Sequence, residues 1–230
     1  MQVCFNQSLN FDSIRRQYQN DRRVRIEKVL LPALAESMAS KLSKLSYTNA
    51  FISEGINQTI THQDLQAMPD SQRQQFFQTL YAQAAQGVGF FYGRHQLLAD
   101  KNSPLDKVLS WLNSVDTLEQ IKFITGHNDI DHASAQATQY IPGHFLTRHN
   151  DINPIEQRRI AYVLSLSKEW HPDWGGLLQF YQANGMPKDA WSPRFNSMAL
   201  FDVSHVHAVT YVAPYARYPR YSITGWFRAS

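Results

Sequence analysis

The chain has 230 residues, 43% of them hydrophobic, which is enough to bury one substantial core. Its 22 basic and 19 acidic residues nearly balance, and this argues against a nucleic-acid binder or a membrane-surface protein. The single cysteine, Cys4, excludes an intramolecular disulfide and a thiolate zinc cluster and fits a cytoplasmic protein. No stretch has the pattern of a signal peptide or a membrane span, so we expect a soluble, unexported chain.

The first half of the chain has mainly helical patterns. In residues 30–45, Pro32 suits a first helical turn, and Leu34, Met38 and Leu42 recur on one face. The same reasoning, with acidic caps and glycine stops, predicts further helices in residues 71–86, 107–112 and 116–125. Residues 87–98 could add a strand.

From about residue 134 the pattern changes to short apolar or alternating runs between turn residues, as in antiparallel β structure. The expected strands are residues 137–140, 159–166, 177–181, 197–203, 206–212 and 221–228. Such a set favours a mainly β fold with flanking helices, built on a jelly roll. We expect one domain, with residues 1–130 as helical support and 131–230 as the jelly-roll catalytic core.

His-x-Asp is a recurrent metal-binding pattern, and it occurs at His127 and Asp129, His149 and Asp151, and His171 and Asp173. The first pair follows the stop of a helix, and the third precedes a proline in an apparent loop. His149 instead ends an extended run. In an extended chain residues two apart lie on one side, so His149 and Asp151 can chelate one metal ion.

A third ligand must come from another segment, and HVHAVTYV offers His205 and His207 on one face of a predicted strand. Two imidazoles and one carboxylate leave three positions open on a six-coordinate metal, which is typical of non-heme iron(II) oxygenases. Two of these positions suit the keto-acid end of 2-oxoglutarate, and the last suits dioxygen.

The remote carboxylate of 2-oxoglutarate needs a cation, and the last predicted strand supplies one. Arg220, Ser222 and Thr224 alternate onto one face of RYSITGWFR. A guanidinium pairs bidentately with a carboxylate, and either hydroxyl could add a hydrogen bond. Tyr140 either hydrogen-bonds the cosubstrate or fills a core position, and Trp226 is expected to close the apolar floor.

Several blocks together resemble the prolyl hydroxylase superfamily of iron(II)- and 2-oxoglutarate-dependent oxygenases, over roughly residues 133–228. Tyr140-x-x-Gly143-x-Phe145 before His149-x-Asp151 resembles the entry to the family's iron site. The matching blocks that follow are RRIAYVLSLSKEW, WGGLLQFY, NSMALFDVS and RYSITGWFR. Because His-Ala-Val usually follows the family's distal ligand, the resemblance selects His207 and leaves His205 outside the ligand set.

The resemblance implies a double-stranded β-helix, iron(II) held by His149, Asp151 and His207, 2-oxoglutarate held by Arg220, and ascorbate as a reductant. It also implies a dioxygenase that hydroxylates a C–H bond, most simply a prolyl residue of a protein, with release of succinate and carbon dioxide. The helical front half and the phrase LEQIKFITG are similar to the ribosomal-protein prolyl hydroxylases, which makes a ribosomal protein the expected substrate.

Two other functions stay open at this point. One is oxidative demethylation of nucleic acid or protein, which would require a basic groove and a flipped-base pocket. The other is a sensor that binds iron or 2-oxoglutarate without turnover. A basic cluster is expected to be a solvated helix face, with docking on ribosomal RNA or an acidic partner as the alternative; its members are Arg15, Arg16, Arg22, Arg23 and Arg25.

Overall fold

The computed structural model describes residues 3–53, 55–97 and 105–230. Six α-helices lie within these residues: α1 (Phe11–Asp21), α2 (Pro32–Leu42), α3 (His62–Ala67), α4 (Asp70–Ala85), α5 (Asp106–Leu112) and α6 (Val115–Thr125). A single 3₁₀ turn, η1 (Pro172–Trp174), adds to them in the described part of the second half. The four helices expected from the sequence are confirmed as α2, α4, α5 and α6, with ends that differ by at most three residues.

The strands form one antiparallel sheet that curls on itself. Its order is β1-β11-β8-β13-β6-β4-β7-β12-β9-β10, with β2 attached to β4, β3 attached to β2 and β5 attached to β13. The first six strands are β1 (Arg23–Glu27), β2 (Thr48–Ser53), β3 (Ile56–Thr61), β4 (Phe90–Gln96), β5 (His132–Ala133) and β6 (Gln136–Tyr140). The rest are β7 (Phe145–His149), β8 (Arg158–Ser165), β9 (Leu178–Tyr181), β10 (Pro187–Trp191), β11 (Ser197–Asp202), β12 (His207–Val209) and β13 (Arg220–Arg228).

The two faces of the sheet have different partners. On β8, Ile160, Tyr162 and Leu164 belong to the large core that the sheet forms with α1, α2, α5 and α6. Successive side chains of a strand point to opposite faces, so Ala161 lies on the inner face. There it packs with Phe180 of β9 and with β11, which shows that the two halves of the curled sheet face each other. This is the double-sheet jelly roll that the sequence predicted.

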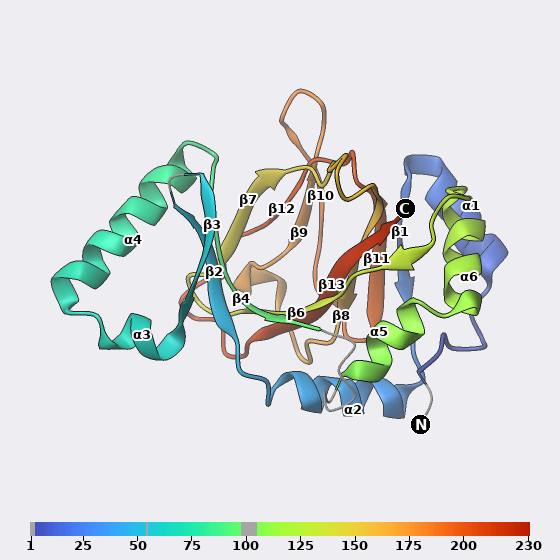
Figure 1. Cartoon of the computed structure of the whole chain (residues 1–230), viewed down its shortest axis with the longest axis horizontal. Helices are drawn as coiled ribbons and strands as arrows, with labels where there is room; N and C mark the ends of the chain where they lie inside the picture. The colour runs from blue at the N-terminus through green and yellow to red at the C-terminus, as the bar shows by residue number, and fades with distance from the viewer. Residues whose placement is uncertain (1–2, 54, 98–104) are drawn as a thin grey trace.

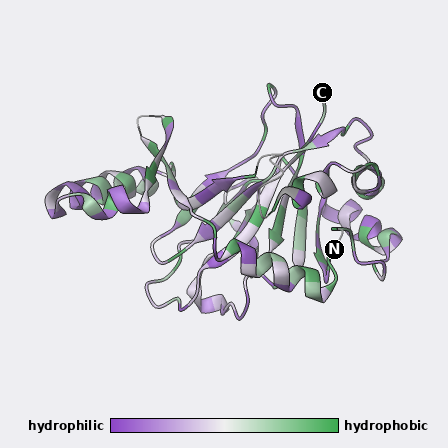
Figure 2. Ribbon diagram, turned by 60° about the horizontal axis from the view of Figure 1, so that its bottom comes forward, coloured by the Kyte–Doolittle hydropathy of each residue, from purple (hydrophilic) through white to green (hydrophobic). Residues whose placement is uncertain are grey.

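Figure 1 shows how the helices surround this sheet. α1 and α6 stand together on its right side, α2 and α5 lie below it, and β2, β3, α3 and α4 project as a lobe on the left. Figure 2 shows apolar residues concentrated in the central strands and in the helices that cover them. None of the described helices has the length and apolar character that a membrane crossing requires.

The first half contains more β structure than the sequence indicated. The strand expected within residues 87–98 is confirmed as β4, but β1, β2 and β3 were missed. β1 and β4 pair with strands of the second half, so the sheet runs across the expected boundary at residue 130. β3 gave no signal because its residues are nearly all exposed and only Ile56 and Ile60 are apolar, so the alternation of a half-buried strand is absent.

Only part of the basic cluster is a helix face: Arg15 and Arg16 lie on α1, where Arg16 is exposed. Arg23 and Arg25 lie on β1, whose alternating Val24 and Ile26 are buried in the core. Arg23 pairs with Asp21 and Asp189, both at 2.5 Å, and Arg25 pairs with Glu27 at 2.9 Å. The expected solvated helix face is therefore wrong for these residues, because their charges hold a strand at the edge of the sheet.

Candidate metal and cosubstrate site

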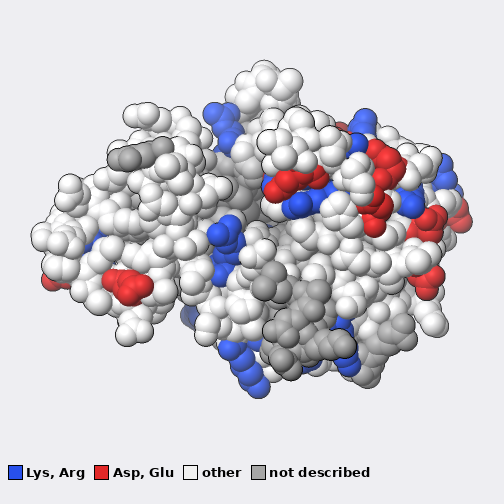
Figure 3. Space-filling view, in the orientation of Figure 1, with Lys and Arg blue, Asp and Glu red and all other residues white. Residues whose placement is uncertain are grey.

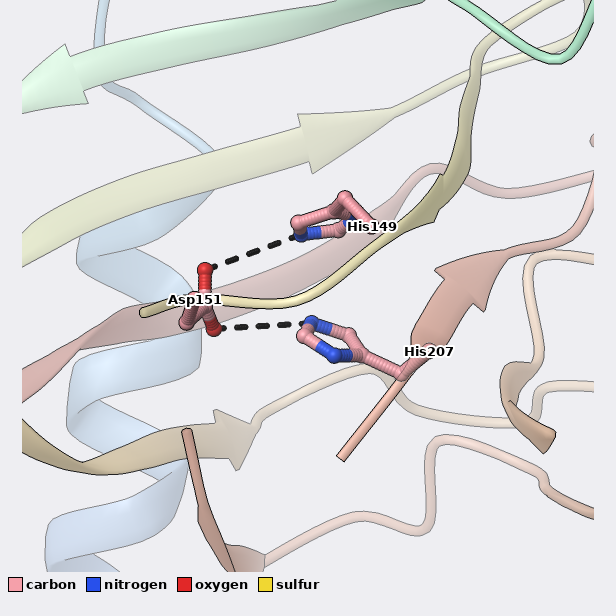
Figure 4. Close-up of side chains that lie close together, drawn as sticks. All are labelled: His149, Asp151 and His207. Carbon is pink, nitrogen blue, oxygen red and sulfur yellow. Dashed lines mark ion pairs between the residues drawn. The ribbon is translucent and has the colours of Figure 1, made fainter. Parts of the chain in front are cut away.

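Three side chains from two neighbouring strands meet at one point of the inner face. His149 ends β7, Asp151 follows two residues later, and His207 begins β12, which pairs with β7 so that the two histidines lie opposite each other. Nε2 of His149 lies 3.7 Å from Asp151 Oδ1, and Nε2 of His207 lies 3.5 Å from Asp151 Oδ2 (Figure 4). Within the described parts of the chain, this is the single group of His, Cys, Asp and Glu residues able to hold a metal ion.

Hydrogen bonds to the backbone fix the orientation of both imidazoles. Nδ1 of His149 lies 3.0 Å from the carbonyl oxygen of Thr147, and Nδ1 of His207 lies 3.0 Å from that of His205. A carbonyl oxygen can only accept, so each Nδ1 donates and each Nε2 keeps its lone pair for a metal. Burial lowers the pKa of His207 to about 4, which keeps this ring neutral near pH 7.

The other two His-x-Asp pairs take no part in this group of ligating residues. His127 lies 3.4 Å from Asp202, and Asp129 pairs with Arg159 at 2.8 Å. His171 and Asp173 are largely exposed, with 3.6 Å between Nδ1 and Oδ2. Only the pair His149 and Asp151 is joined by a third ligating side chain in the described structure, as the strand context of the sequence indicated.

The structure shows that His207, and not His205, is the third ligating residue. Nε2 of His205 lies 2.8 Å from the carbonyl oxygen of Asp21, on the amino-terminal side of the sheet, so this ring faces away from the three ligating atoms. Its backbone carbonyl nevertheless orients His207, as described above. His205 is therefore a supporting residue of the site and not a member of the ligating group.

Arg220 is the first residue of β13 and lines the same cavity as the three ligating side chains. It is only 2% exposed, and its Nε has no hydrogen-bond partner among the described residues. No carboxylate of the described chain pairs with it, and its guanidinium carbon lies 5.0 Å from the centroid of the Tyr140 ring. Burial lowers the pKa of Arg220, which is the sign of a cation that lacks a counter-ion.

The other three predicted cosubstrate residues surround Arg220 in different ways. The Ser222 hydroxyl lies 2.8 Å from that of Thr138 on β6, so the two hydroxyls share one hydrogen bond. The Thr224 hydroxyl accepts a long hydrogen bond, 3.5 Å, from Gln136. Tyr140 is 3% exposed and stacks on Tyr92, with ring centroids 5.1 Å apart. Tyr140 and Thr224 line the cavity, as does Thr138, the partner of Ser222.

The cavity has a volume of about 720 Å³ and is open between the barrel and the lobe of β2 to α4. Figure 3 shows this hollow, with charged side chains gathered over the barrel and few on the lobe. Arg158 lies in the cavity wall 3.8 Å from Asp151 and 3.5 Å above the ring of Trp226. Trp226 packs against the apolar cluster of the inner face, as the sequence suggested, and it also lines the cavity beneath the Arg158 guanidinium. Arg158 was missed because a strand arginine carries no motif.

Comparison with a protein family agrees with this geometry. Residues 135–228 match the family described as the 2OG-Fe(II) oxygenase superfamily. The matched segment contains His149, Asp151, His207 and Arg220. This segment, and the site within it, belongs to the 2OG-Fe(II) oxygenase superfamily, whose name states its dependence on iron(II) and 2-oxoglutarate.

Similar curated proteins are prolyl hydroxylases. Over 124 residues, 51% of this chain and 22% of the relative, the chain is 35% identical to the prolyl 3-hydroxylase OGFOD1 of Xenopus laevis. Over 134 residues, 53% of this chain and 23% of the relative, it is 28% identical to the prolyl 3-hydroxylase sudestada1 of Drosophila melanogaster. Each match covers less than a quarter of the relative, so the chain corresponds to one part of these longer proteins.

Solved structures share the fold over nearly the whole chain. A prolyl-4-hydroxylase of Pseudomonas putida aligns with a TM-score of 0.65 at 17% identity, covering 96% of this chain and 100% of that one. A prolyl hydroxylase of Trichoplax adhaerens, solved with a peptide fragment of hypoxia inducible factor, aligns with a TM-score of 0.67 at 15% identity, covering 95% and 89%. The jelly roll and the helices around it are therefore a recurrent arrangement.

The geometry predicts one divalent metal site. We expect Co²⁺, used as an air-stable substitute for iron(II), to bind with a stoichiometry of one in isothermal titration calorimetry. Asp151→Ala or His207→Ala should weaken binding by roughly tenfold or more, because each removes a ligand atom. His171→Ala, in an exposed His-x-Asp pair, is the matched control and should bind as the unaltered protein does. Equal loss in the control would contradict this assignment.

Proposed function

We propose that this chain is an iron(II)- and 2-oxoglutarate-dependent dioxygenase that hydroxylates a prolyl residue of a protein. The observation that carries the proposal is Arg220, a buried guanidinium without a carboxylate partner in the described chain, in the same cavity as the ligating group of His149, Asp151 and His207. A metal site alone would suit many reactions. The added cation supports a cosubstrate that carries a carboxylate at a distance from the metal.

The site residues fit the two groups that the family requires. Nε2 of His149, Nε2 of His207 and one oxygen of Asp151 would hold iron(II), and three coordination positions would stay open. Arg220 would pair with the far carboxylate of 2-oxoglutarate, with the hydroxyl pair of Ser222 and Thr138 beside it. When bound, iron(II) and 2-oxoglutarate would supply the oxidation, in which 2-oxoglutarate and dioxygen give succinate, carbon dioxide and one oxygen atom for the substrate C–H bond.

The protein itself would orient the reactants and limit access of water. Tyr92 and Tyr140 form a stacked aromatic wall around the Arg220 end of the cavity. Such a wall lowers the local dielectric constant and strengthens the pairing of the guanidinium with a carboxylate. The cavity is open on the side of the lobe, which supports entry of the substrate from there.

A protein substrate is supported by the curated relatives, which are named prolyl hydroxylases. The finer parts of the proposal are a ribosomal protein as the substrate, ascorbate as the reductant and the cytoplasm as the compartment. The first two rest on the resemblance of the sequence to ribosomal-protein prolyl hydroxylases, and the third on its single cysteine. We also propose that residues 1–230 act as one domain, because strands of both halves share the sheet.

Replacement of Arg220 tests the cosubstrate role. Arg220→Gln should raise KM for 2-oxoglutarate by about 100-fold, because charge-assisted hydrogen bonds contribute about 1.5–3 kcal/mol each. The thermal midpoint of the protein without cosubstrate should stay equal or rise, since the variant no longer buries an unpaired cation. Succinate release and a thermal shift assay give the two quantities, with Arg159→Gln on the outer surface as the control. A large loss of stability without a change in KM would mean that Arg220 is structural.

The substrate class can be tested by mass spectrometry. Proline-containing peptides from ribosomal proteins, incubated with the protein, iron(II), 2-oxoglutarate and ascorbate, should gain one oxygen atom on a prolyl residue. The Asp151→Ala variant should give no gain. Peptide-dependent succinate release with oxygen on another residue type would contradict the prolyl assignment and leave the dioxygenase assignment intact.

A further inference from the structure

The turn between β11 and β12, residues 203–206, holds two of the three ligating residues. The carbonyl oxygen of Val203 accepts a hydrogen bond, 2.9 Å, from the backbone N–H of Asp151. The carbonyl oxygen of His205 accepts the Nδ1 hydrogen of His207 at 3.0 Å. Any change in the path of this turn would therefore move the carboxylate of Asp151 and the imidazole of His207 together.

Asp202, the last residue of β11, fixes the path of this turn. Its Oδ1 accepts hydrogen bonds from the backbone N–H of Ser204 at 3.0 Å and from the Ser204 hydroxyl at 2.5 Å. Its own carbonyl oxygen accepts the N–H of His205 at 3.1 Å. Asp202 thus binds the turn through both its side chain and its backbone, and it does not line the cavity.

The junction of α1 and β1 holds the same turn from outside. Nη2 of Arg22 lies 2.5 Å from Oδ2 of Asp202, and the Arg22 carbonyl accepts the backbone N–H of Asp202 at 3.0 Å. One residue earlier, the carbonyl of Asp21 accepts the Nε2 hydrogen of His205 at 2.8 Å. Arg22 adopts a left-handed φ of 51° as the C-cap of α1, which turns the chain into β1 beside β11.

The charge of Asp202 is stabilised where it lies. Burial alone would raise its pKa, but hydrogen bonds from His127 and Ser204, together with the charge of Arg22, outweigh burial and hold the pKa below its usual range. Asp202 is 6% exposed, so its carboxylate stays ionised because these partners surround it. Both of its oxygens are engaged, one by the turn and one by the amino-terminal segment.

We propose that Asp202 is a positioning residue of the metal site and that Asp21 and Arg22 support it from a segment outside the one matched by the oxygenase family. The chain of contacts runs from Arg22 to Asp202, from Asp202 to the turn, and from the turn to Asp151 and His207. Side chains that orient metal ligands typically change metal affinity by roughly 10- to 100-fold when removed. The inference rests on the proposed metal site.

The test is metal binding by variants of Asp202. Asp202→Ala should weaken Co²⁺ binding by roughly tenfold or more and change the visible absorption spectrum of the bound ion, since the ligand geometry changes. Asp202→Asn keeps an oxygen that accepts from Ser204 and should recover most of the affinity and the spectrum. Arg22→Gln should give an effect between those of Asp202→Ala and Asp202→Asn, because its carbonyl still accepts the backbone N–H of Asp202.

The matched control is Asn196→Ala at the opposite end of the same strand. Asn196 is 6% exposed and makes two hydrogen bonds with the backbone of Leu30, so its loss should lower the thermal midpoint without affecting Co²⁺ affinity or spectrum. Asp202→Ala with unaltered affinity and spectrum, or Asn196→Ala with the same loss, would overturn the proposal. Failure of the unaltered protein to bind Co²⁺ would instead overturn the proposed function.

Discussion

The cost of burying an unpaired guanidinium is the constraint around which the site is organised. Arg220 lies almost fully inside the sheet with no carboxylate of the described chain beside it, and such a charge is costly unless an anion joins it. With iron(II) on the ligating group, the charges are +2 from the metal, −1 from Asp151, +1 from Arg220 and −2 from 2-oxoglutarate. These four charges sum to zero, and the far carboxylate of 2-oxoglutarate would supply the counter-ion that Arg220 lacks in the protein alone.

The register between β7 and β12 positions the two histidines of the metal site. Pairing of β7 with β12 places His207 opposite His149, and Asp151 reaches the same point because the chain bends back toward residues 203–206. The strands place the two histidines opposite each other, whereas the Asp151 carboxylate and the orientation of the His207 ring depend on the turn and hence on the α1–β1 junction. The helical first half therefore covers the outer face of the sheet and also bears on the geometry of the metal site.

The sequence predicted the parts of this arrangement that depend on local pattern. The apolar faces of α2 and α4, the alternating strands of the second half and the pair His149 and Asp151 could be read from spacing. The resemblance to the oxygenase family selected His207 over His205. β1 was missed because the arginines that flank its two buried residues suggested a charged surface, although Val24 and Ile26 alternate as a strand requires. Asp202 and Arg158 could not be predicted, because their roles arise from contacts between segments far apart in the chain.

The most direct test of this account is the crystal structure of the protein with iron(II) and 2-oxoglutarate, prepared without oxygen, with iron located by anomalous scattering. The account predicts one iron atom about 2.0–2.2 Å from Nε2 of both histidines and from an Asp151 oxygen, distances usual for such ligands. It also predicts the far carboxylate of 2-oxoglutarate in bidentate contact with Arg220. Iron bound away from this group, or a cosubstrate that leaves Arg220 unpaired, would contradict it.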